Sequence, residues 1–105
     1  MELTTEMMSK AGVPAEMTQD GKPAEQVQVR VKMFDPSGSW TWYVTEYDYQ
    51  RQECFGLVVG FEEELGYFHL PELNAITGAF GLGIEQDLHW DPKTTLAQVK
   101  SGERR

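Results

Sequence analysis

The alternation of apolar and polar residues between residues 26 and 33 constrains the fold of this chain more than any other feature. Val27, Val29, Val31 and Met33 alternate with glutamine, arginine and lysine. Successive side chains of a β-strand point to opposite faces, so this period of two predicts a strand with one buried and one solvated face. The sequence therefore predicts a sheet that starts here.

The next forty residues supply the other strands of this sheet. Residues 35–38 have the composition of a turn, and residues 40–47 form the second strand. Residues 55–61 are apolar on both faces, which predicts the central strand, and residues 65–70 predict a fourth. The second strand is expected to place Trp40, Trp42, Val44 and Glu46 on one face and Thr41, Tyr43, Thr45 and Tyr47 on the other.

The N-terminal quarter of the chain is predicted to be a short helix followed by a loop. Thr4 or Thr5 can cap this helix, and Gly12 ends it. Residues 14–25 are polar and contain proline and glycine, which is typical of a mobile loop.

Helical signals return after the fourth strand. Residues 71–76 begin with proline and carry an acid in the first turn, which predicts a helix that the glycine-rich residues 78–83 end. Residues 84–90 predict a short fifth strand or an ordered loop. Thr94 or Thr95 can cap a last short helix.

Together these patterns predict one α+β domain over residues 1–105. Its fold would be a small antiparallel β-meander of four to five strands, with a short N-terminal helix and short C-terminal helices packed against one face of the sheet. The domain divides into an N-terminal helix and mobile loop (1–25), a sheet-containing core (26–92) and a short helix with a frayed tail (93–105). The outer edge of the first strand could pair with a copy of the chain, so a monomer or a homodimer is expected.

Acidic side chains dominate the middle of the chain. Between Met33 and Pro92 there are eleven acids and one base, a net charge of −10, compared with −8 for the whole chain. Direct binding of nucleic acid is not expected, because a phosphate backbone requires a basic footprint. A basic partner protein is compatible with this charge.

The expected location is the cytoplasm, away from membranes. The single Cys54 suits a reducing compartment and is expected to be a buried thiol. The first residues do not have the composition of a secretion signal, and no apolar stretch has the length of a membrane span.

Several separated motifs resemble one family. They are WTWYVTEYD at 40–48, FGLVVGFEEELGYF at 55–68, LPELNAI at 70–76, GLGIE at 81–85 and DLHW at 87–90. Together they are similar, over residues 27 to 92, to the small bacterial family called domain of unknown function 2958. The resemblance implies a setting on plasmids, integrative elements or phages, often near antirestriction and replication genes. It implies no activity and no catalytic residues.

The acidic run at residues 62–64 has two interpretations. It can be a solvated hairpin turn that keeps a small sheet soluble. Alternatively, carboxylates spaced along strands and turns can imitate a run of phosphates and bind a basic groove. The candidate partner-binding acids are Glu46, Asp48, Glu53, Glu62, Glu63, Glu64, Glu85 and Asp87. An acid pair acting as in a glycosidase is disfavoured, because so short a chain offers little room for a sugar cleft.

The aromatic side chains have two interpretations as well. Alternate rings can fill the core and form cross-strand pairs. Those on the opposite face can anchor a protein interface, where Trp and Tyr are common hot spots. The candidates for that second role are Trp40, Tyr43, Tyr47 and Tyr49.

No catalytic residue, metal site or cofactor is expected. His69 and His89 each lack a neighbouring Cys or His, and an apolar strand disfavours a Cys54 thiolate. The glycines at 78–83 lack the Lys-Ser/Thr of a phosphate loop.

The expected function is therefore that of an acidic, non-enzymatic interaction protein of mobile-element origin. It would bind and inhibit a host defence complex that has a basic nucleic-acid-binding groove, as anti-CRISPR and antirestriction proteins do. The alternative is an accessory protein of plasmid maintenance or transfer that binds single-stranded nucleic acid or a replication protein.

Overall fold

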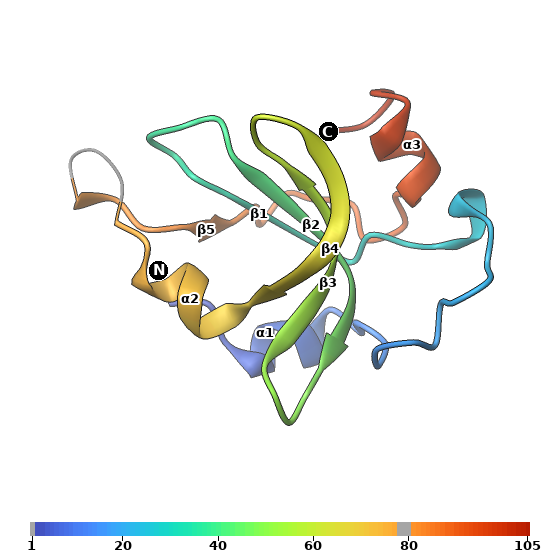
Figure 1. Ribbon diagram of the computed structural model, residues 1–105, viewed down its shortest axis with the longest axis horizontal. Coiled ribbons are helices and arrows are strands. Elements are labelled where there is room, and N and C mark those ends of the chain that lie inside the picture. The colour runs from blue at the N-terminus through green and yellow to red at the C-terminus, as the bar shows by residue number, and fades with distance from the viewer. Residues whose placement is uncertain (1, 78–80) are drawn as a thin grey trace.

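Five antiparallel strands form one sheet in the order β4-β3-β2-β1-β5 (Figure 1). A computed structural model describes residues 2–77 and 81–105. The strands are β1 (Val31–Phe34), β2 (Thr41–Asp48), β3 (Glu53–Val59), β4 (Glu63–His69) and β5 (Glu85–Gln86). Short helices precede and follow them, which confirms the predicted α+β class.

The first four strands form the predicted meander, and the fifth returns to the outer edge of the first. Met33 pairs with Gln86, and Phe34 pairs with Glu85. The expectation of a free edge on the first strand is therefore wrong, because β5 covers that edge. The middle strand of the five is β2, whereas the segment predicted to be central forms β3, one place away.

The alternating segment at 26–33 is buried as predicted, but only its last part lies in the sheet. Val27, Val29, Val31 and Met33 are all buried. The amide of Val29, however, donates to the carbonyl of Thr94 at 2.8 Å. The first half of the predicted strand therefore pairs with the segment before the last helix, and β1 begins at Val31.

The helices form where local signals predict them. In α1 (Thr5–Lys10), Oγ1 of Thr4 accepts a hydrogen bond from the amide of Met7 at 3.2 Å. In α3 (Leu96–Lys100), Thr95 and Gln98 form a reciprocal capping box. Helix α2 (Leu70–Ala75) has proline in its first turn, and a 3₁₀ turn, η1 (Ala24–Gln26), precedes β1. The predicted glycine-rich end of α2 includes residues 78–80, which lie outside the described residues.

The sheet separates two hydrophobic clusters, one on each face. Residues from α1 and α2, among them Met8 and Leu73, pack on the face that carries Met33 and Val44. Residues from α3 pack on the opposite face with Tyr43 and Leu57. Figure 1 shows α3 at the upper right, beyond the strands from α1 and α2. The prediction that the helices pack against one face is therefore wrong, because both faces of the inner strands are apolar.

A β-bulge in β2 changes which side chains are buried. Val44 pairs with Gly56, but Glu46 pairs with Phe55, so Thr45 is the extra residue. The predicted assignment of faces holds as far as Val44 and is wrong beyond it. Tyr47 joins the cluster of Val44, and Glu46 turns to the other face.

Candidate functional site

The predicted acidic surface is divided, and its first member, Glu46, is internal. The Glu46 side chain is buried, and its carboxylate accepts hydrogen bonds from the amides of Met17 at 3.0 Å and Gln19 at 2.8 Å. These bonds tie the loop at 14–25 to the sheet, with a further bond from the Tyr47 amide to the Pro14 carbonyl at 2.9 Å. Because it is buried and occupied, Glu46 cannot contact a partner, and its prediction as a binding residue is corrected.

Asp48 and Glu53 lie at the β2–β3 turn, where each has a structural partner. Asp48 accepts hydrogen bonds from the amides of Gln50 at 2.9 Å and Arg51 at 3.0 Å, and the Arg51 bond is the main cause that lowers the pKa of Asp48. Glu53 lies 4.0 Å from Nε2 of His69. Asp48 therefore shapes the turn, whereas Glu53 faces the end of β4.

The same end of the sheet holds an acid that sequence reasoning missed, Glu16. Its Oε2 atom is buried and has no hydrogen-bond partner within the described ranges. Burial, the neighbouring Glu53 carboxyl group and the nearby charges of Asp48 and Glu46 raise the pKa of Glu16 to about 7. No local signal could have identified Glu16, because it stands in a polar loop whose path depends on Glu46.

Glu85 and Asp87 stand on β5 and directly after it, beside a lysine. Nζ of Lys32 is 3.6 Å from a carboxylate oxygen of Asp87, and the rings of Tyr43 and Trp90 lie within 6.0 Å of that nitrogen. Glu85 is only half-buried. The negative potential at this edge is therefore partly neutralised.

Glu62, Glu63 and Glu64 are the predicted acids that project into solvent. They occupy the β3–β4 turn and the start of β4, so the run predicted as a turn is partly strand. Glu63 forms an ion pair with Arg105. Within residues 2–77 and 81–105, no Lys or Arg forms an ion pair with Glu62 or Glu64. The side chain of the preceding Phe61 is 94 % exposed.

Two of the four candidate aromatics are core residues. Tyr43 is buried with its hydroxyl donating to the Arg105 carbonyl at 3.0 Å, and buried Tyr47 shares a hydrogen bond with Thr5 at 2.8 Å. Neither can contact a partner, so both predictions are corrected. Tyr49 is 38 % exposed, but its hydroxyl donates to the Val13 carbonyl at 2.6 Å.

Trp40 is the candidate aromatic that lies beside the exposed acids. It is 37 % exposed, and its ring meets that of Phe61 edge-on, with 5.5 Å between the centroids. We call Trp40, Phe61, Glu62, Glu63 and Glu64 the acidic tip. It combines Glu62 and Glu64, which have no Lys or Arg ion-pair partner within the described ranges, with an exposed apolar anchor. Sequence reasoning named its acids and Trp40 but omitted Phe61, whose exposure follows only from the position of the turn.

A thiol and an imidazole stand on neighbouring strands, Cys54 on β3 and His69 at the end of β4. Cys54 is a buried free thiol whose pKa is raised, chiefly by burial. His69 contacts Glu72 at 3.4 Å on the surface. No group of three His, Cys, Asp or Glu side chains in the described ranges could hold a metal ion. None of the described helices has the length and apolar character of a membrane span.

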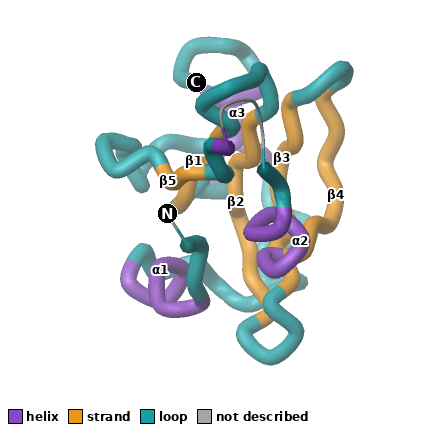
Figure 2. The backbone as a smooth tube through the Cα atoms, turned by 90° about the vertical axis from the view of Figure 1, so that its left-hand side faces the viewer, coloured by secondary structure: helices purple, strands orange, loops and turns teal. Residues whose placement is uncertain are grey.

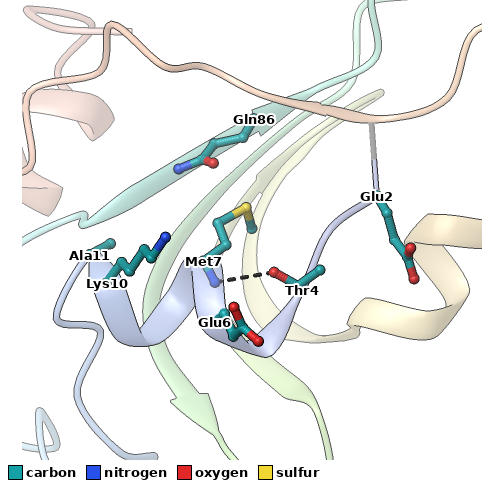
Figure 3. A pocket seen from close by; sticks show the side chains of 7 residues that line it. All are labelled: Glu2, Thr4, Glu6, Met7, Lys10, Ala11 and Gln86. Atoms are coloured by element: carbon teal, nitrogen blue, oxygen red, sulfur yellow. Dashed lines mark hydrogen bonds between the residues drawn. The ribbon is translucent and has the colours of Figure 1, made fainter.

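A hollow of about 500 Å³ lies between α1 and β5 (Figure 3). Its lining includes Glu6 and Lys10 of α1 and Gln86 of β5. None of the predicted partner-binding residues lines it.

Comparison with known proteins places the chain in one family. The model of the family described as "Protein of unknown function (DUF2958)" matches residues 2–103, nearly the whole chain, and the chain belongs to that family. No curated protein and no solved structure matches it. The family confirms the resemblance drawn from the motifs.

Proposed function

We propose that the protein is a non-enzymatic inhibitor that binds a host nucleic-acid-binding defence complex, of the anti-CRISPR or antirestriction kind, through the acidic tip. One observation carries the proposal: Glu62 and Glu64 are exposed without a basic partner in the described structure, beside the fully exposed ring of Phe61. A basic groove that normally holds phosphates would attract these carboxylates over long range. Phe61 and Trp40 would add apolar contact at short range.

The proposed binding surface is smaller than the whole acidic section. Glu46 is internal, Asp48 shapes a turn and Asp87 is paired with Lys32. The tip is therefore a small projecting feature, and it would enter a groove end-on instead of covering it.

The proposal is tested by reversing charge at two places. The double substitution Glu62→Lys and Glu64→Lys should weaken binding to a purified effector or restriction complex by roughly tenfold or more, because two attractive pairs become repulsive. The matched control is Glu2→Lys with Glu25→Lys, which changes net charge equally at two other exposed acids. Equal weakening of binding by the two double variants would show that only net charge matters. It would refute the proposal that the acidic tip is the binding surface.

A second measurement separates the alternative function. The proposed complex should weaken as salt is added, and the chain should not shift labelled single-stranded DNA in a gel at low salt. A shift that disappears steeply with salt would instead support an accessory protein of plasmid maintenance or transfer that binds single-stranded nucleic acid.

A further inference from the structure

Strand β4 is the open edge of the sheet. It pairs with β3 along its whole length, and within residues 2–77 and 81–105 no other strand pairs with its outer side. Figure 2 shows β4 at the margin of the molecule, whereas β1 is covered by β5. The outward-facing backbone groups of such an edge strand are a template for another strand.

The hydrogen-bond pattern identifies the backbone groups that face outward. The amide of Leu70 donates to the carbonyl of Gln52, and the amide of Gly60 donates to that of Glu62, each at 3.0 Å. Both bonds belong to the same antiparallel ladder, in which bonded and non-bonded pairs alternate, so Gly56 and Gly66 are a bonded pair. The amides and carbonyls of Glu63, Leu65, Tyr67 and His69 therefore point away from β3.

The side chains of β4 are complementary to a second β4 that runs antiparallel about Gly66. In that register Leu65 of one chain lies opposite Tyr67 of the other, and Glu63 lies opposite His69. Leu65 and Tyr67 are 44 % and 63 % exposed, on the face where Tyr67 already contacts Phe55 at 4.9 Å between ring centroids. Each pair would gain a cross-strand apolar or acid–imidazole contact.

We propose that β4 is a homodimer interface, in which two chains join edge to edge about Gly66 and form one continuous ten-stranded sheet. The outward groups of Glu63, Leu65, Tyr67 and His69 become hydrogen-bonded across a two-fold axis. A second copy fits better than an unrelated strand, because Leu65 meets Tyr67 and Glu63 meets His69 when β4 pairs antiparallel with itself. The proposal does not rest on the function proposed for the acidic tip, although Glu63 and Glu64 belong to both surfaces and Glu64 would lie opposite Phe68 of the second copy.

Sedimentation equilibrium tests the dimer. The full chain should approach twice its mass of 12.0 kDa as protein concentration rises. Tyr67→Lys should keep the mass of one chain, because two added lysines lie beside the axis. The control Leu88→Lys makes the same kind of change at an exposed residue far from β4 in sequence and should dimerise as the wild type does. A wild-type chain that stays monomeric at every concentration overturns the proposal and leaves the edge to a different partner.

Cross-linking tests the register. A Cβ at Gly66 would meet no atom within 4 Å, so Gly66→Cys leaves the fold intact. Opposite residues in a non-bonded pair have Cα atoms about 4.5 Å apart, which suits a disulfide. Gly66→Cys should therefore form a covalent dimer on mild oxidation. Glu64→Cys should not, since its two copies would lie roughly 13 Å apart. Equal cross-linking of the two variants would refute the register.

Salt separates this dimer from the proposed inhibitory complex. Each chain carries a charge of −8, so added salt screens repulsion between copies and should strengthen the dimer. The complex with a basic partner should weaken under the same conditions. A dimer that dissociates as salt is added would contradict an interface built on backbone bonds and apolar pairs.

Discussion

The carboxyl group of Glu16 lies among other acids at one end of the sheet. Glu53, Asp48 and Glu46 face it, and burial is the largest cause of its raised pKa. The folded chain therefore binds this proton more tightly than the unfolded chain, in which the pKa is 4.5. The resulting stabilisation is complete below pH 4.5 and is lost as the pH rises through about 7.

Replacing this acid should remove that pH dependence. The wild type is expected to lose about 1–2 kcal/mol of unfolding free energy between roughly pH 5 and pH 8, after allowance for solvent screening. Glu16→Gln should flatten this slope and be the more stable protein at the higher pH. Urea unfolding across the pH range measures both, with the exposed Glu25→Gln as control. If the unfolding free energy of Glu16→Gln depends on pH as steeply as that of the wild type, other groups cause the pH dependence.

Burial of single residues was only partly predictable from the sequence. The alternation correctly predicted that Val27, Val29, Val31 and Met33 are buried, because a period of two can be recognised without knowing which distant residues pack against the strand. Tyr43, Tyr47 and Glu46 were misassigned as surface residues. Tyr43 is buried because α3 packs on the second face of the sheet, whereas Tyr47 and Glu46 change faces because of the bulge at Thr45, which depends on pairing with β3.

At the scale of elements, Gly56 marks a close approach of β3 to β2. A Cβ built on Gly56 would lie 1.8 Å from the carbonyl oxygen of Tyr43, next to the bulge. Only glycine fits there, because the obstacle is backbone that cannot rotate away. The same Cβ on Gly66, directly opposite on β4, meets nothing within 4 Å.

These two glycines give a matched pair of variants. Gly56→Ala should destabilise the fold by about 3 kcal/mol or more, because the strands must separate to admit the methyl group. Gly66→Ala should change stability by less than about 1 kcal/mol. Guanidinium unfolding monitored by tryptophan fluorescence measures both variants. Similar losses at the two positions would mean that strand entropy, and not the close approach, decides the outcome.

The elements that local chemistry determines were predicted well. Thr4, Thr95 and Pro71 mark helix starts within one turn, because a cap acts on residues that follow it directly. The edge of the sheet was predicted wrongly, because the pairing of β5 with β1 joins residues about fifty positions apart. The exposed carboxylates of the acidic tip were visible in the sequence, but Glu16 was not.

For the whole molecule, the excess of acids outweighs its few ion pairs. The ion pairs include Lys32–Asp87, Arg104–Asp91 and Arg105–Glu63. The chain nevertheless keeps a net charge of −8. Such an excess destabilises a compact state by self-repulsion.

Added sodium chloride should therefore stabilise the fold. We expect the midpoint of thermal unfolding to rise by about 2–5 °C, equivalent to roughly 0.5–1 kcal/mol, as repulsion is screened. Scanning calorimetry at a fixed low protein concentration measures this shift. The variant Glu62→Gln with Glu64→Gln carries less charge and should respond less. A midpoint that falls with salt would show that the ion pairs outweigh the repulsion.

The division of the hydrophobic core into two clusters by the sheet affects how cooperatively the molecule unfolds. β2 gives Val44 to one cluster and Tyr43 to the other, and β3 gives Cys54 and Leu57 in the same way. The two clusters therefore pack on opposite faces of the same strands. Water that entered one cluster would also destabilise the strands on which the other cluster packs. Because the two hydrophobic clusters share these strands, they are expected to unfold together. The chain should therefore lose its structure in a single cooperative step.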